Sequence, residues 1–155
     1  MLYEDIRAIY TKFKLYYYRR IFRKLDTGAK DALTAIETFC AEAIYGLGRP
    51  NLTEFAKFIN VSQPNAAYKI RSLEKKGYVR RVRSEADCRV VHLEVTEKFM
   101  KLYGSSERYA KVLAKRIQRR FPEEDIQKLE EMLGIISNEL MREVNIYLQT
   151  PVEDV

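Results

Sequence analysis

Basic side chains gather between residues 62 and 91 of the 155-residue chain. This stretch holds eight basic and three acidic residues, a net charge of +5 beside a formal +6 for the whole chain. The basic residues are Lys69, Arg71, Lys75, Lys76, Arg80, Arg81, Arg83 and Arg89. Ammonium and guanidinium groups at this density are typical of a surface that neutralises phosphates. The alternative is that they only solvate a helix face and an edge strand.

A short helix is expected immediately before this stretch. Asn51 can accept hydrogen bonds from the first free N–H groups of a helix, and Glu54 can reach back to complete a reciprocal cap. Asn60 follows where the chain must turn, and Asn adopts a left-handed backbone more readily than most residues. The apolar positions at helical spacing are Leu52, Phe55 and Ile59.

A second helix is predicted to begin at Ser62 as N-cap, with Pro64 in its first turn, and to end at Gly77. Its core positions are expected to be Ala66, Ile70 and Leu73. Residues 78–83 and 90–95 are predicted to form two strands around a charged tip. Val91, Leu93 and Val95 alternate with Val90, His92 and Glu94, so one face is expected to be buried and His92 to point outward.

Two helices joined by a tight turn are a device for docking into the DNA major groove, where the second helix reads the bases. Asn and Gln suit bidentate contact with adenine, and Lys suits guanine. The expected partner is therefore double-stranded DNA. The residues expected to contact it are Ser62, Gln63, Asn65, Tyr68, Lys69, Arg71, Ser72, Lys75, Arg81 and Arg83.

Several motifs also carry a family resemblance. The runs Leu52-Thr-Glu-Phe-Ala, Val61-Ser-Gln-Pro, Leu73-Glu-Lys-Lys-Gly-Tyr-Val, Asp87-Cys-Arg89 and Val95-Thr-Glu-Lys resemble the winged helix of MarR-family transcription regulators. The resemblance is specific over residues 51–98 and looser over the rest of the chain. It implies a homodimer on an inverted-repeat operator, with each wing tip near the minor groove. By resemblance, Asp87 orients Arg89 toward phosphates or the minor groove.

Four positions depart from the family pattern. Ala67 and Tyr68 stand where many members carry a hydroxyl residue followed by Arg, so Ala67 joins the expected DNA contacts and the base sequence stays open. Phe99 stands where Gly is common, and Phe121 where Ser or Thr often caps the last helix.

Long apolar stripes are expected on the terminal helices. The first helix is predicted over residues 2–25, and its excess of aromatic residues predicts burial on two sides. Further helices are predicted from Asp31 to Leu47, from a Thr96 cap to about Arg120, and after Glu123. The residues expected at an interface with a second copy are Ile6, Ile9, Phe13, Leu133, Ile136, Leu140, Val144 and Tyr147. Packing within one subunit is the alternative for the last helix.

The expected fold class is mainly α with a small β-wing, a winged helix-turn-helix domain plus a helical dimerisation lobe. The chain is long enough for one domain, here residues 1–155. Within it, residues 31–97 are expected to form the winged-helix lobe, and residues 1–27 and 98–150 the dimerisation helices.

An enzyme is not expected, and neither is a catalytic residue, a metal or a cofactor. His92 is the only histidine, and the chain has no Cys-x-x-Cys, His-Glu-x-x-His or P-loop motif. Gly46-Leu-Gly48 lacks the preceding strand of a phosphate loop and is interpreted as a helix end. No apolar stretch approaches about 20 residues and no signal peptide is visible. The expected location is cytoplasmic, with the nucleoid, and no membrane partner is expected.

Regulation has two candidate origins. By resemblance, a small aromatic or anionic effector would relieve repression from a cleft lined by Tyr10, Tyr17, Phe39 and Tyr45. Cys88 lies beside an arginine at the wing tip, so a redox-responsive regulator is an alternative, whereas Cys40 lies on an apolar helix face. A protein–protein interaction module, or a small-molecule-binding protein that has lost DNA contact, are rivals from other classes.

Overall fold

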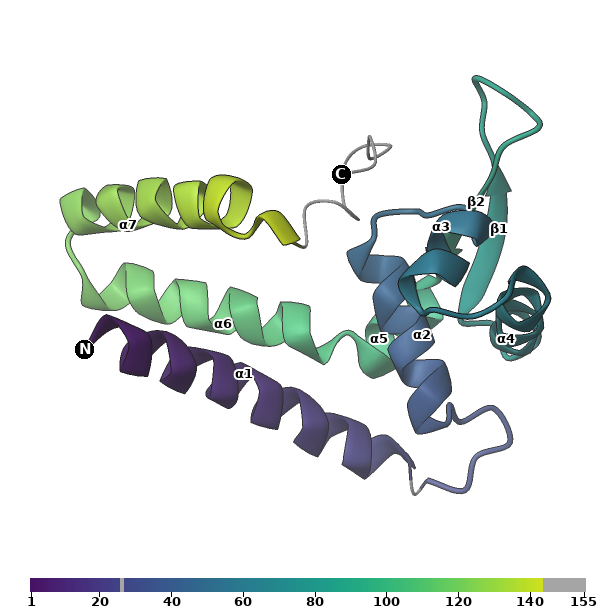
Figure 1. Ribbon diagram of the computed structural model, residues 1–155. Coiled ribbons are helices and arrows are strands. Elements are labelled where there is room, and N and C mark those ends of the chain that lie inside the picture. The colour runs from purple at the N-terminus through teal and green to yellow at the C-terminus, as the bar shows by residue number, and fades with distance from the viewer. Residues whose placement is uncertain (26, 144–155) are drawn as a thin grey trace. The chain divides into compact units, whose positions relative to one another are not determined.

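The computed structural model describes residues 1–25 and 27–143, apart from the side chains of residues 105 and 106 (Figure 1). The chain forms two compact units, residues 1–106 and residues 107–155. The first contains α1 (Leu2–Leu25), α2 (Ala35–Gly46), α3 (Leu52–Phe58), α4 (Gln63–Lys75), β1 (Val79–Arg83), β2 (Val91–Val95) and α5 (Glu97–Tyr103). The second contains most of α6 (Ser105–Arg120), then α7 (Glu123–Ile135) and a π-helical turn, η1 (Ile136–Leu140). The expected fold class, mainly helical with a small β-wing, is confirmed.

Helix α1 has the predicted bounds, and burial increases toward its C-terminal end. Ile21 is buried, Phe13 and Tyr17 are half-buried, and Ile6 and Ile9 are each 56% exposed.

No helix in residues 1–25 or 27–143 combines the length and apolar character needed to cross a bilayer.

Helix α2 begins at Ala35, four residues later than predicted. Thr34 accepts a hydrogen bond from the Glu37 N–H at 3.2 Å, and the Glu37 carboxylate accepts one from the Thr34 N–H at 2.9 Å. This reciprocal cap fixes the helix start. The Asp31 carboxylate instead pairs with Lys98. The helix ends at Gly46, as the sequence predicted for this glycine pair.

Helices α3 and α4 end in the same way. After α3, the N–H groups of Asn60 and Val61 donate to the carbonyls of Lys57 and Ala56, with Asn60 at φ 57°. After α4, the N–H groups of Gly77 and Tyr78 donate to Glu74 and Leu73, with Gly77 at φ 82°. Both are Schellman motifs, which require a residue that tolerates a left-handed backbone. The predicted Asn51–Glu54 and Ser62 caps are also present.

Strands β1 and β2 form an antiparallel hairpin that extends from the helices as a wing (Figure 1). Val79 pairs with Val95 at its base and Arg83 with Val91 near its tip. Pro50 precedes the hairpin in sequence, and its carbonyl accepts a hydrogen bond from the Leu93 N–H of β2 at 2.7 Å. The hairpin is therefore anchored to the segment between α2 and α3.

One apolar core joins α2, α3, α4, the wing and α5. The predicted core positions of α4 are fully buried in it. Its largest fully buried members are Tyr78, Phe55, Phe99, Leu33, Ile44, Ile70, Leu73 and Leu93. The departure at position 99 is therefore accommodated by burial of the Phe ring, which stacks on Tyr103 at 5.7 Å between centroids.

The long helix predicted from Thr96 to Arg120 is interrupted at Gly104. Thr96 caps α5 as expected, but Gly104 ends that helix, and α6 begins at residue 105. A Cβ at position 104 would lie 2.5 Å from the Met100 carbonyl oxygen. Only glycine therefore fits this close approach, and the prediction of one continuous helix was wrong.

Few side chains of the second unit are shielded from solvent. The chain reverses at Phe121 and Pro122 between α6 and α7 (Figure 1), and Pro122 at the N-cap makes no side-chain cap. Of residues 107–143, only Ile126 is buried.

Candidate nucleic-acid interface

Helix α4 has one buried face and one exposed polar face. Ala66, Ile70 and Leu73 are each 0% exposed against the core. The exposed positions recur at helical spacing on the opposite side, with the ring of Tyr68 near the centre at 68% exposure. They are Gln63, Pro64, Asn65, Tyr68, Arg71 and Lys75. The helix can therefore offer a continuous row of polar groups to a groove while its other side holds it in the fold.

Four predicted contact residues of α4 are less available for contact: Gln63, although it lies in this row, and Ser72, Lys69 and Ala67. The Gln63 amide donates to the Thr53 hydroxyl at 2.9 Å, and the half-buried Ser72 hydroxyl donates to the Glu37 carboxylate at 2.6 Å. Lys69 is half-buried and near Cys40, where its charge opposes the larger effect of burial, which raises the pKa of that thiol. Ala67 is also half-buried.

The wing tip is held by the Asp87 side chain. Its carboxylate accepts from the backbone N–H of Arg89 at 3.0 Å, and the Asp87 carbonyl accepts from the Val90 N–H. The tip closes with the Ser84 N–H donating to the Val90 carbonyl at 2.9 Å. Asp87 therefore orients the backbone at Arg89, through an Asx turn.

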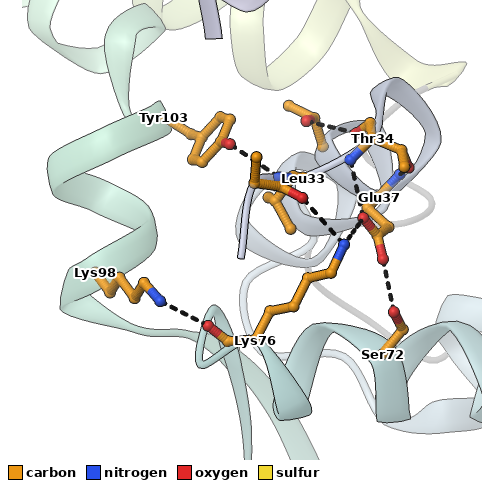
Figure 2. A network of polar contacts seen from close by, with 9 residues as sticks. Leu33, Thr34, Glu37, Ser72, Lys76, Lys98 and Tyr103 are labelled. Carbon is orange, nitrogen blue, oxygen red and sulfur yellow. Dashed lines mark hydrogen bonds and ion pairs between the residues drawn. The ribbon is translucent and has the colours of Figure 1, made fainter. Parts of the chain in front are cut away.

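The basic residues of this surface divide into engaged and unpaired cations. Arg80 pairs with Glu94, Arg81 with Glu74 at 3.1 Å, and Lys76 with Glu37 at 2.6 Å (Figure 2). Within residues 1–25 and 27–143, the other five have no acidic partner within 4.0 Å. These unpaired cations are Lys69, Arg71, Lys75, Arg83 and Arg89. They lie along α4 and toward the wing tip, where a phosphate backbone would meet them first.

Positive charge is not confined to this surface. The net charge of residues 62–91 alone had predicted that it would be. Helix α1 carries seven basic and two acidic residues, and α6 carries six basic and one acidic residue, so each has a net charge of +5. Residues 123–140 carry six acidic residues and one basic residue. What distinguishes the winged helix is that its unpaired cations lie beside the exposed face of the second helix of a helix-turn-helix.

The other predicted site residues lie in both units. Tyr10, Phe39 and Tyr45 are exposed, whereas Tyr17 is half-buried and its pKa is raised by burial and by the nearby Glu42 carboxylate. Leu133, Ile136 and Leu140 are exposed on α7 and η1. Val144 and Tyr147 lie outside the described residues.

The two cysteines lie as predicted, whereas the histidine does not. Cys40 is buried and Cys88 is exposed, as predicted. His92 was expected to point outward, but it is half-buried, and its Nδ1 lies 2.9 Å from the Arg49 carbonyl oxygen. This contact helps to fix Arg49, which adopts φ 69°.

Comparison with known proteins agrees with this geometry. Residues 33–91 match the model of the MarR family. Transcriptional regulator Tm0710 from Thermotoga maritima is 20% identical with a TM-score of 0.58, covering 90% of this chain and 96% of that one. A MarR-like regulator, tm0816, from the same organism is 20% identical with a TM-score of 0.52, covering 90% and 94%.

A MepR mutant from a multidrug resistant S. aureus isolate is 16% identical with a TM-score of 0.55, covering 91% of this chain and 98% of that one. The curated proteins gave no match. At these identities the solved structures show a shared fold alone. The winged-helix segment of this chain, residues 33–91, is similar to the MarR family, whose model it matches.

Proposed function

We propose that this chain is a transcription regulator that binds double-stranded DNA through α4 and the wing. The observation that carries the proposal is the exposed face of α4 flanked by unpaired cations. The chain does not act as an enzyme in this proposal.

Phosphates and bases are contacted by different groups. Arg71, Lys75, Arg83 and Arg89 bind phosphates and release counterions, which makes affinity depend steeply on salt. Asn65 and Tyr68 lie on the exposed face where base edges would be met, and a good bidentate contact discriminates by about 1–3 kcal/mol. The cations therefore give affinity, and the polar row gives sequence preference.

The operator is an inverted repeat bound by two copies. Ile6 and Ile9 on α1, with Leu133, Ile136 and Leu140 in the second unit, leave apolar surface exposed. A second copy is the partner that covers such surfaces on both molecules at once. Two α4 helices about one helical turn of DNA apart then read two half-sites.

Repression relieved by a small aromatic or anionic ligand completes the proposal. Tyr17 and Glu42 lie close together where α1 meets α2, and the exposed Phe39 and Tyr45 belong to the same α2 helix. A ligand bound near these residues would change the spacing of the two α4 helices, and a wrong spacing releases one half-site.

Titration of a fluorescent random-sequence duplex at about 50 and 200 mM salt tests the proposal. Four phosphate contacts predict a loss of affinity of about two orders of magnitude between these concentrations. Arg89→Ala should weaken binding to every duplex equally and reduce the salt slope by about one unit. Asn65→Ala should reduce preference at one base position and leave the slope unchanged.

Weak binding in both buffers would contradict the proposal. It would favour a winged helix that docks on an acidic protein, or a small-molecule-binding protein without DNA contact. Reversible loss of DNA affinity on oxidation, abolished by Cys88→Ser, would instead favour redox control.

A further inference from the structure

One carboxylate joins the start of α2 to the end of α4. The Glu37 Oε2 atom accepts from the Thr34 N–H at 2.9 Å and from Lys76 Nζ at 2.6 Å. Its Oε1 atom accepts from the Ser72 hydroxyl at 2.6 Å. Figure 2 shows the Glu37 side chain between the α2 start and these two residues of the α4 end. The side chain therefore caps one helix and holds another.

A second set of contacts, made by Lys98, holds the same region together. Lys98 Nζ donates to the Lys76 carbonyl at 2.8 Å and to the Asp31 carboxylate, and it lies 4.6 Å from the centre of the Tyr78 ring. Lys76 Nζ also donates to the Ala32 carbonyl at 3.0 Å. The segment between α1 and α2 is therefore bound to the corner where α4 turns into the wing.

Helix α3 provides the comparison, because it begins with an equivalent cap. The Glu54 carboxylate accepts from the Asn51 N–H at 2.9 Å, and Asn51 accepts from the Glu54 N–H at 2.8 Å. In the described part of the chain, Glu54 has no second donor. Capping alone therefore does not require the additional contacts that Glu37 makes.

Ser72 and Lys76 are one turn apart, so they lie on the same side of α4. Their neighbours in sequence, Arg71 and Lys75, lie next to them on the exposed face. Two anchors one turn apart fix the rotation of the helix about its axis. A change in that rotation would move the exposed row relative to a groove.

We propose that Glu37 is a positioning residue for DNA reading, which holds Ser72 and Lys76 and thereby sets the rotation of α4. This rests on the proposed function. The contacts are charge-assisted and half-buried, so they are stronger and more directional than a surface ion pair. Lys76 acts inside the protein and makes no phosphate contact.

The test compares Glu37→Gln with Glu54→Gln. Gln serves the cap as Glu does, but it removes the charge and one of the two acceptor oxygens. The probes are a duplex selected by the wild-type protein from a random library and a random-sequence duplex of equal length. The measured quantity is the ratio of the two affinities, with thermal melting recorded for each variant.

Glu37→Gln should lower the ratio about tenfold, the value of one lost base contact, with affinity for the random duplex retained. Glu54→Gln should keep the wild-type ratio. Equal ratios for the two variants would overturn the inference. A wild-type protein that binds neither duplex would overturn the proposed function itself, and the inference with it.

Lys76→Met gives a second readout, which also serves if Glu37→Gln does not fold. Positioning predicts a lower affinity ratio with an unchanged salt slope, because this ammonium group is paired internally. A slope reduced by about one unit would make Lys76 a phosphate contact and would overturn the inference.

Discussion

The winged helix and the second unit use similar apolar residues with opposite results. In residues 33–95 a set of large apolar side chains converges on one core, where Ile44, Phe55, Ile70 and Leu73 are completely buried, although Ile36 and four aromatic side chains stay exposed. In residues 107–143, Met132, Leu133, Ile136 and Leu140 remain exposed, from 41% to 64%. The winged helix thus closes a core of its own, whereas residues 107–143 bury a single side chain, that of Ile126.

This difference separates a segment that can fold by itself from one whose apolar surface needs a partner. A segment with a closed core and capped helices can position side chains without a partner. A pair of helices with an open apolar stripe gains most of its burial only when a partner covers the stripe. In the proposed function, DNA reading therefore belongs to the first and pairing of two copies to the second.

The same substitution in both regions gives the largest expected contrast. Leu73→Ala should lower the free energy of unfolding by about 2–5 kcal/mol, because it opens a cavity in a closed core. Leu133→Ala should change it by less than about 0.5 kcal/mol at low protein concentration, because half of that side chain is exposed. Urea denaturation of dilute protein measures both.

Sedimentation of the Leu133 variant supplies the second half of this contrast. Leu133→Ala should weaken self-association, and Leu73→Ala should affect it only through unfolding. A Leu133 variant as destabilised as Leu73→Ala in dilute protein would place that side chain in a closed core and abolish the distinction.

The pH dependence of the free energy of unfolding tests the contact between α1 and the winged helix. Burial raises the pKa of Glu42 from 4.5 to about 7. The folded carboxyl therefore keeps its proton to a higher pH than the unfolded one, and stability falls as the pH rises from about 4.5 to 7. Glu42→Gln should raise the free energy of unfolding by about 1–3 kcal/mol at pH 8 and little at pH 4.

Glu37 should show the opposite dependence. Burial alone would raise its pKa, but hydrogen bonds from Lys76, Ser72 and the Thr34 N–H lower it below the ordinary value. Its stabilisation is therefore present above about pH 4.5 and is lost as the pH falls through the lowered pKa. Urea denaturation from pH 3 to 8 would contradict both assignments if the two Gln variants followed the wild-type curve.

Local patterns made much of the winged helix predictable. The Asn51–Glu54 cap, the left-handed Asn60 and the Gly77 helix end each depend on residues within a few positions of one another. The start of α2 carried the same kind of signal in Thr34 and Glu37, but the apolar stripe from Leu33 onward suggested an earlier start. The break at Gly104 depends on contact with the Met100 carbonyl, which an apolar period does not reveal.

The roles of individual cations were less predictable, because their partners are distant in sequence. Lys76 meets Glu37 39 residues away, and Lys98 meets Asp31 67 residues away. Composition counts all of these as basic, although only some are available to a phosphate. The sequence also could not show that Ser72 faces Glu37.

The smallest expected effect is a difference in the salt slope of DNA binding between two arginines of β1, one paired with an acid and one unpaired. Arg81 and Arg83 both lie exposed on β1, but only Arg81 pairs with an acid, Glu74. Arg83→Ala should reduce the salt slope of DNA binding by about one unit. Arg81→Ala should reduce it less, as measured by titration over several salt concentrations. Equal slopes for the two variants would mean that the Glu74 pair opens on DNA.

Selection of duplexes from a random library by the wild-type protein, followed by sequencing, tests the central claim most directly. If two copies present α4 to successive major grooves, the enriched duplexes will contain an inverted repeat with half-site centres about 10 base pairs apart. A library that emerges without any enriched sequence, or with a single unrepeated site, would contradict this account.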